Sequence, residues 1–160
     1  MWYPVNYFIF FSNIPFPSAF KVFLLRLFGA KVGVGVVVKQ KTRVKNPWRL
    51  SIGNHCWIGE GAWIDNIEDV SIGNNVCLSQ NAILLTGNHD YSSSSFSPRY
   101  GKIELQDGVW ICANAIVCPG VICKSHSVLT VNSVATKSLE GMKIYSGNPA
   151  VFMRDRIINE

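Results

Sequence analysis

Aliphatic residues recur at every sixth position through most of this chain. In the second half the series consists of Leu105, Ile111, Val117, Cys123, Leu129 and Ala135. A second series lies four residues after the first and is built mainly from small residues, such as Ala115 and Ser133. A helix has a period near 3.6 residues and a strand has a period of 2, so neither explains this pattern. The repeating unit of the fold is therefore six residues long.

The same period governs the first half of the chain. Its aliphatic members are Val32, Val38, Val44, Ile52, Ile58 and Ile64, and after a slip of two residues Ile72, Leu78 and Leu84. Gly53, Gly59 and Gly73 directly follow three of them. Because glycine permits φ > 0, these positions suit tight turns between short strands.

A short strand plus a turn accounts for a six-residue unit. Three units close a triangle, with the aliphatic residue pointing to the axis and the small residue in the corner. Successive triangles stack at the strand spacing of about 4.8 Å, so that residues about 18 apart lie above one another. The sequence predicts an all-β fold, a parallel β-helix of about five coils over residues 32–140. Residues 85–104 break the period with four consecutive serines and are expected to form a loop extruded from the prism.

The chain divides into three parts on this pattern. Residues 1–29 are an apolar N-terminal segment with a helix, residues 30–140 are the β-helix domain, and residues 141–160 are a C-terminal tail. Prolines interrupt the first part, and no apolar run reaches the roughly 18 residues of a membrane-spanning helix. A signal peptide would have a basic start and a small-residue cleavage site, and both are missing, which predicts a cytoplasmic location.

A helix is predicted over residues 19–28 of the N-terminal segment. Ser18 is suited to cap it and Gly29 to end it, and Lys21 and Arg26 are its only charged residues. A helix that is apolar almost all round must bury against something. Two interpretations stay open: it plugs the open end of the core, or it contacts a membrane surface or a neighbouring subunit.

Composition, charge and cysteine spacing narrow the class of protein. With 160 residues, 48% hydrophobic and 16% charged, the chain is one globular domain and not a disordered one. A net charge of +5 favours an anionic partner, such as a phosphorylated cofactor, a nucleic acid or an acidic membrane. The five cysteines form no C-x-x-C pair and are expected to be reduced and buried. The histidines and cysteines also lack metal-ligand spacing, so no metal site is predicted.

Several stretches resemble the hexapeptide-repeat acyltransferases, whose fold is a left-handed parallel β-helix. They are IGNHCWIGEGAWID, SIGNNVCLSQNAILLTGNHDY, DGVWICANAIVCPGVI, VLTVNSVATKSL and YSGNPAVFMRDR. Within this family, TGNHDY, GNPAVFMRDR and FLLRLFGAKVG resemble the colanic-acid-type exopolysaccharide O-acetyltransferases. The resemblance covers nearly the whole chain. It implies transfer of acetyl from acetyl-CoA, as co-substrate, to a hydroxyl, at a site between two subunits of a homotrimer.

His89 is the expected general base. A neutral imidazole, with a pKa near 6.5, can take the proton of a sugar hydroxyl as it attacks a thioester. His89 also lies where a periodic segment gives way to the loop, in the motif that carries the resemblance. His55 and His126 are interpreted as ordinary repeat-position residues.

The resemblance assigns roles to further residues by position. Asp65 and Asn66 match positions that hold acceptor hydroxyls, although an Asp-Asn pair also suits a turn. Asn88 and Tyr91 flank the base and either shape the acceptor pocket or order the loop. Trp110 would form a wall for the pantetheine arm, or serve only as a packing aromatic.

The same resemblance places the cofactor. Ala113 would donate its backbone N–H to the thioester oxyanion. Val131, Thr136 and Lys137 match positions that contact CoA, and Arg154 matches a tail residue near its phosphates, which suits cationic side chains. Cys112, Cys118 and Cys123 depart from the family pattern.

Three functions compete on the sequence. The first is an O-acetyltransferase acting on a sugar or lipid-linked sugar in surface-glycan biosynthesis. The second is an acetyltransferase acting on a nucleotide-sugar amine or a small xenobiotic, and the third is a catalytically silent trimeric scaffold. Nucleic-acid binding is not expected, because no aromatic and basic platform is present. Alternating cations from Lys39 to Lys45 suggest a peripheral membrane contact or simply a solvated face.

Overall fold

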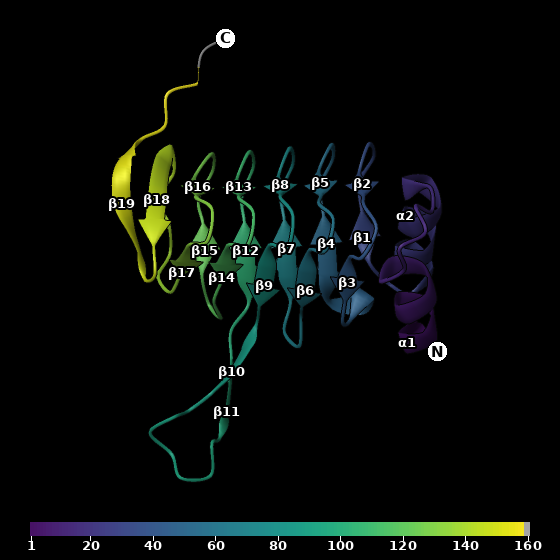
Figure 1. The fold of residues 1–160 in the computed structure, drawn as a ribbon, viewed down its shortest axis with the longest axis horizontal. Coiled ribbons are helices and arrows are strands. Elements are labelled where there is room, and N and C mark those ends of the chain that lie inside the picture. Colours follow the sequence, from purple (N-terminus) through teal and green to yellow (C-terminus); the bar gives the residue numbers. More distant parts are fainter. Residues whose placement is uncertain (159–160) are drawn as a thin grey trace.

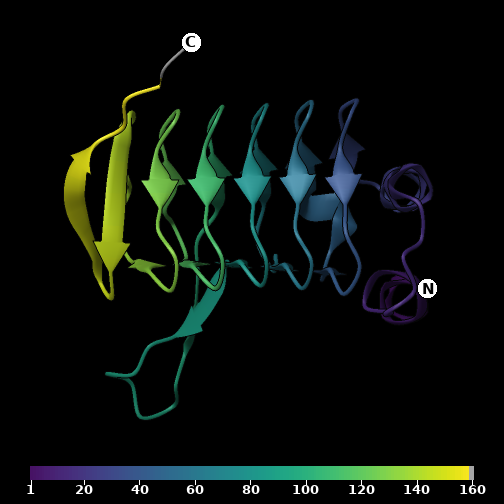
Figure 2. The ribbon, with the colours of Figure 1, turned by 45° about the horizontal axis from the view of Figure 1, so that its top comes forward.

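The computed structural model describes residues 1–158 and has the shape of a triangular prism (Figures 1 and 2). Short parallel strands stack coil upon coil into three sheets, here called faces A, B and C. Corners AB, BC and CA are the turns that join each face to the next. The predicted parallel β-helix, with about five complete coils, is confirmed.

Each face collects one strand from every coil. Face A contains β1 (Lys31–Val32), β4 (Leu50–Ile52), β7 (Val70–Ile72), β12 (Ile103–Leu105) and β15 (Ile122–Cys123). Face B contains β2 (Val37–Val38), β5 (Trp57–Ile58), β8 (Cys77–Leu78), β13 (Trp110–Ile111) and β16 (Val128–Leu129). Face C contains β3 (Arg43–Val44), β6 (Trp63–Asp65), β9 (Ile83–Leu85), β14 (Ile116–Val117) and β17 (Val134–Ala135). At the C-terminal end, β18 (Lys143–Gly147) extends face B and pairs antiparallel with β19 (Ala150–Asp155).

The sixfold pattern fills the interior as predicted. On face B the inward column consists of Val38, Ile58, Leu78, Ile111 and Leu129, each at most 2% exposed. The small residues four positions further on, such as Ala115 and Ser133, are buried in the corners. Every coil adds one aliphatic residue per face to a continuous column. A single coil could not bury these residues alone, and the stacked coils together form the hydrophobic core.

The stacking distance along the chain differs from the expectation. Residues 18 apart pair in the later coils, as between Trp110 and Val128. In the first three coils the pairs are 20 apart, as between Lys31 and Ser51, so the expected spacing was wrong there. The extra residues lie at corner CA, where the first coil also forms a short 3-10 helix, η2 (Pro47–Arg49).

Histidine also occupies turn positions. His55 and His126 have φ of 55° and 60° in the same column of corner AB. Each ring lies beside a glycine of the preceding coil, Gly35 or Gly108, where a Cβ would clash with the ring. These contacts agree with their interpretation as repeat-position residues. All five cysteines are free; three are buried as expected, whereas Cys77 and Cys118 are partly exposed. Burial raises the pKa of each thiol.

Two helical layers, here called the cap, cover the first coil: α1 (Trp2–Val5) with the π-helix η1 (Asn6–Phe10), and α2 (Ser18–Leu27) (Figure 1). Residues 2–10 were not predicted to be helical. Side chains of the cap bind the strand edge beneath it: Trp2 Nε1 donates to Val44 O at 2.7 Å, and Lys21 Nζ to Lys39 O at 2.8 Å. Such contacts close an edge that could otherwise pair with another chain.

Ser18 corrects a detail of the prediction. It does not cap α2; Pro17 occupies the N-cap, and Ser18 Oγ instead bonds the backbone N–H of Val38 at 3.1 Å. The hydroxyl is used by the sheet edge because that N–H has no strand partner beyond it. Within residues 1–158 no helix combines the length and apolar character needed to cross a bilayer.

The extruded loop contains its own hairpin, β10 (Gly87–His89) and β11 (Pro98–Tyr100). It leaves the prism at corner CA between the third and fourth coils (Figure 1). Leu85, Ile103 and Glu104, which were expected in the loop, belong instead to strands β9 and β12. All insertions of the prism therefore fall at one corner.

Candidate active site

His89 ends the first strand of the hairpin and its side chain is exposed. Its Nδ1 lies 2.6 Å from the backbone oxygen of Phe96. Because a carbonyl oxygen can only accept a hydrogen bond, Nδ1 carries the proton and Nε2 is left as the basic nitrogen. Phe96 itself has φ of 48°, an unusual conformation for an aromatic residue. The hairpin thus holds the imidazole in the tautomer that a general base requires.

An ion pair braces the hairpin beside His89. Arg99, on β11, pairs with the carboxylate of Asp90, which also accepts hydrogen bonds from Ser92. The Ser92 hydrogen bonds, together with Arg99, hold the pKa of Asp90 below its usual range. The carboxylate therefore stays ionised and keeps the two strands together. Sequence reasoning missed Arg99 and Phe96, because only the folded hairpin brings them to His89.

Two of the predicted acceptor-binding residues lie on the hairpin. Asn88 Oδ1 accepts the backbone N–H of His89 at 2.8 Å, which orders the strand. Tyr91 is 90% exposed and lies two residues after His89. Their acceptor roles stay predictions, but both lie within two residues of the imidazole.

The other two predicted acceptor-binding residues, Asp65 and Asn66, lie one coil earlier, next to the point where the hairpin leaves the prism. Asp65 ends β6 beside Leu85, and its carboxylate is 2.9 Å from Lys45 Nζ. Asn66 is completely buried, and its amide bonds the backbone of Asn46 at both ends, at 2.9 Å and 2.6 Å. Asn66 therefore has a role in holding corner CA together. Its predicted contact with an acceptor stays a prediction, and each end of its amide already has one hydrogen-bond partner.

Two of the predicted cofactor residues lie at a different corner from the hairpin. Ala113 and Val131 follow one another at corner BC in the fourth and fifth coils, where Asn132 N–H donates to Ala113 O at 3.1 Å. The backbone N–H of Ala113 makes no hydrogen bond within residues 1–158. Trp110, on face B, is 44% exposed and donates to Ser79 Oγ at 2.9 Å. The free N–H is suited to the predicted contact with a thioester oxygen, and the exposed indole to the predicted contact with a pantetheine arm.

Three further residues supply the nucleotide end. Thr136 and Lys137 are exposed at corner CA after β17, and Arg154 is exposed on β19. Neither Lys137 nor Arg154 makes an ion pair in the part of the chain that is described. Both cations are free to meet phosphate groups. One chain thus carries His89 and Ala113 at different corners of the prism and does not bring them together by itself.

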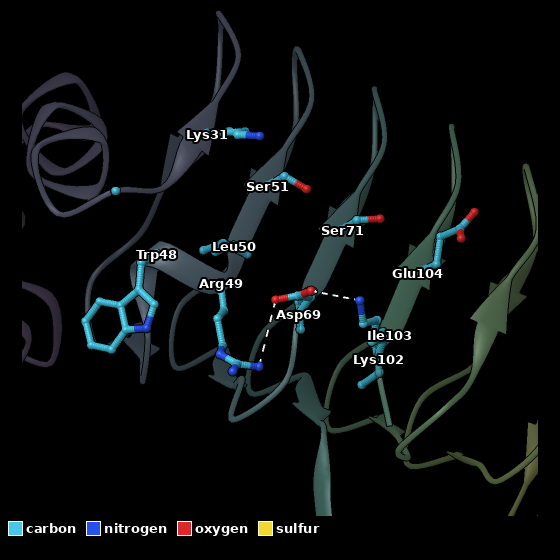
Figure 3. A pocket seen from close by; sticks show the side chains of 12 residues that line it. Lys31, Trp48, Arg49, Leu50, Ser51, Asp69, Ser71, Lys102, Ile103 and Glu104 are labelled. Carbon is cyan, nitrogen blue, oxygen red and sulfur yellow. Dashed lines mark ion pairs between the residues drawn. The ribbon is translucent and has the colours of Figure 1, made fainter. Parts of the chain in front are cut away.

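A hollow of about 410 Å³ opens on face A beside the cap (Figure 3). Lys31, Ser51, Ser71 and Glu104 line its floor in four successive coils, and Trp48 forms one edge. Asp69 lies between Lys102, at 3.0 Å, and Arg49, at 4.0 Å. The hollow is lined by none of the predicted site residues.

Sequence comparison decides the family. No family model matches the chain. The putative colanic acid biosynthesis acetyltransferase WcaF of Escherichia coli (strain K12) is 32% identical over 160 residues, which cover 100% of this chain and 88% of that protein. The chain belongs to the hexapeptide-repeat acetyltransferases of the colanic-acid type. The resemblance in its motifs is thereby confirmed, and the protein is an acyltransferase.

Solved structures of other acetyltransferases share the fold. One, from Vibrio cholerae O1 biovar eltor in complex with acetyl coenzyme A, has a TM-score of 0.84 at 21% identity and covers 91% of this chain and 81% of its own. A maltose O-acetyltransferase from Clostridium difficile 630 has a TM-score of 0.79 at 21% identity and covers 92% and 81%. The acetyltransferase described here is accordingly a left-handed parallel β-helix.

Proposed function

We propose that this acetyltransferase transfers acetyl from acetyl-CoA to a hydroxyl of a sugar in exopolysaccharide or surface-glycan biosynthesis, with His89 as general base. The observation that carries the proposal is the hydrogen bond from His89 Nδ1 to Phe96 O, which leaves Nε2 to accept a proton. The names of WcaF and the maltose O-acetyltransferase support a sugar hydroxyl as the acceptor.

Direct transfer needs three events at the reacting centre. Nε2 of His89 takes the proton of the acceptor hydroxyl while its oxygen attacks the thioester carbon. The carbonyl oxygen becomes negative, and the free N–H of Ala113 stabilises it. The intermediate then expels the CoA thiolate, which takes the proton back from the imidazolium. Phe96 O stabilises that imidazolium through Nδ1–H, because a hydrogen bond to the charged form favours it.

The position of the two corners supports a homotrimer with its sites between subunits. His89 leaves corner CA and Ala113 lies at corner BC, so a complete site takes one group from each of two copies. The outer side of face B carries Trp57 and Trp110, each 44% exposed, and the outer side of face C carries the partly exposed Trp63 and Ile83. Face A instead presents polar side chains in its first four coils (Figure 3). Exposed apolar faces favour contact with other copies.

Acetyl-CoA fits the free groups of the chain. Lys137 and Arg154 would bind its phosphates, and Trp110, Val131 and Thr136 would contact the rest of the molecule. Asp65, Asn88 and Tyr91 would orient the acceptor. A lipid-linked sugar as acceptor would place the enzyme in the cytoplasm and in peripheral contact with a membrane.

Measuring the CoA thiol released during acetyl transfer tests the proposal. Acetyl-CoA turnover is measured with a panel of sugars, nucleotide sugars and amino sugars, for wild type, His89→Ala and a matched control, His55→Asn. We expect His89→Ala to lose about 10² to 10⁴ in rate. The control should keep its rate, because asparagine already occupies the same left-handed turn in the next coil, at Asn75.

Three outcomes would contradict the proposal. Equal losses in both variants would mean that His89 acts only on the fold. A wild type that neither binds acetyl-CoA nor turns it over would be a scaffold. Turnover on amino sugars alone would move the acceptor from a hydroxyl to an amine.

A further inference from the structure

We infer that the outer side of the cap docks on an anionic lipid bilayer and thereby sets how far the acceptor sugar lies from the membrane. The inference deepens the proposed function, since it concerns where that acceptor is held. It rests on the proposal only for the identity of the acceptor. The docking itself is independent of the chemistry at His89.

One side of the cap is buried against the first coil, and the other side is exposed. Its inner side packs on the first coil through buried residues such as Phe10 and Leu25. Its outer side exposes large apolar side chains, mostly aromatic: Tyr3, Tyr7, Phe8, Phe23 and Leu27, each 58% to 68% exposed. Because the side chains of the cap already close the sheet edge, the outer residues are not needed for that purpose. An exposed apolar patch of this kind marks an interaction surface.

Charge selects the partner. The first 59 residues contain eight lysines and arginines and no acidic residue, whereas the remaining 101 contain seven and ten. Lys41, Lys45 and Arg49 pair with acidic residues of the following coil and Lys21 is buried, whereas the other four cations of residues 1–59 make no ion pair within residues 1–158. Arg26 and Lys31 lie at the junction of cap and first coil, and neither makes an ion pair within residues 1–158. Aromatic residues flanked by cations suit the interface of an anionic leaflet.

A second copy of the chain fits this surface less well. Two caps facing one another would bring together two segments of like charge, which repel. An anionic bilayer meets both properties at once, because its acyl region accepts the aromatic rings and its headgroups accept the cations. The bilayer is therefore the occupant that we assign.

Docking through the cap would fix the distance between the bilayer surface and the hairpin that carries His89. The hairpin leaves the prism from the third coil, and in both views its tip lies on the side away from the cap (Figures 1 and 2). Two coil spacings of about 4.8 Å and one helix diameter of about 10 Å place this exit roughly 20 Å from the outer side of the cap. The enzyme would thus act on a sugar held away from the bilayer by intervening sugars, and not on the sugar that is attached to the lipid.

Vesicle flotation tests the docking surface. The full chain is mixed with vesicles of phosphatidylcholine alone or with added phosphatidylglycerol. The variants are Phe8→Ser/Phe23→Ser, Lys31→Gln and a control, Ile157→Ser, which changes an 84% exposed residue in the C-terminal segment. We expect wild type and Ile157→Ser to float only with anionic vesicles. The double variant should lose about tenfold or more in partitioning, and Lys31→Gln should bind more weakly at low salt.

Two further measurements separate the possible causes. Thiol release with a soluble acceptor should be unchanged in the double variant, so loss of docking is distinguishable from failure of the chemistry. Size-exclusion chromatography should give the same oligomer for wild type and double variant. Wild type that ignores anionic vesicles, or a double variant that binds them equally well, would overturn the inference. So would a change of oligomer, which would make the cap a protein interface.

Discussion

Proline at position 113 would remove one backbone N–H and little else. Ala113 precedes Asn114, which has φ of 56°, and proline is favoured directly before the left-handed residue of such a turn. Pro119 stands in the same relation to Gly120, with φ of 79°, at the next corner of the coil. The lost N–H bonds nothing within residues 1–158, and the carbonyl that accepts from Asn132 is kept. Ala113→Pro should therefore fold like wild type.

The expected effect on rate follows from the proposed role of this group. Removing one preorganised oxyanion donor lowers kcat by about 10² to 10³, or roughly 2.7 to 4 kcal/mol. The KM for acetyl-CoA should change little, since the group acts on charge that develops in the transition state. Stability should stay within about 1 kcal/mol of wild type, because proline restricts the unfolded chain at a compatible site.

Gln80→Pro is the matched control. Gln80 occupies the same corner one coil earlier and precedes Asn81, with φ of 56°. Its N–H likewise has no partner within residues 1–158, and its carbonyl accepts from Asn114 at 2.9 Å. Both variants are assayed for kcat and KM by thiol release and for stability by thermal unfolding. A folded Ala113→Pro enzyme with the kcat of wild type would refute the oxyanion role. Equal losses in both variants would point to a change of corner shape instead.

Two further predictions concern stability. Leu78→Ala should lower the free energy of unfolding by about 2 to 5 kcal/mol, because Leu78 is fully buried at the centre of the face B column. The control Leu27→Ala, at a residue that is 65% exposed, should lower it by less than about 0.5 kcal/mol, and urea unfolding measures both changes. Burial, followed by the charge of Lys39, lowers the pKa of Lys21 from 10.5 to about 8. The folded state then binds fewer protons than the unfolded state between these values, so stability from this group is present above about 10.5 and lost as pH falls through about 8. Wild type should accordingly gain stability relative to Lys21→Met between pH 8 and pH 10, and a difference that is flat with pH would show that the buried lysine keeps its ordinary pKa.

The sequence predicted the prism well because its information is local. An inward residue at every sixth position needs no distant partner to be recognised, and Leu78 and Ile111 lie in the interior as the period requires. The break in the period also located the segment between β9 and β12, within two residues at each end. His89 is the one histidine outside the repeat turns, which hold His55 and His126.

Details that depend on the number of residues in each coil, or on contacts between distant residues, were harder to predict from the sequence. The first coils hold two residues more than the later ones, so the uniform spacing of 18 failed between Lys31 and Ser51. Ser18 was expected at a helix cap but bonds Val38, because the competing N–H of a sheet edge comes from a segment 20 residues away. Local preference could not reveal that competitor.

The fold, the family and the candidate base could be predicted from the sequence, because an inward residue at every sixth position and short motifs are visible in neighbouring residues. The folded chain was needed to show that Phe96 O accepts a hydrogen bond from His89 Nδ1 and that the cap turns one side to the core and one to solvent. It also decided that His89 and Ala113 lie at different corners. The physical reason is that these properties depend on the register in which the coils close, and register is set by contacts between residues far apart in the chain.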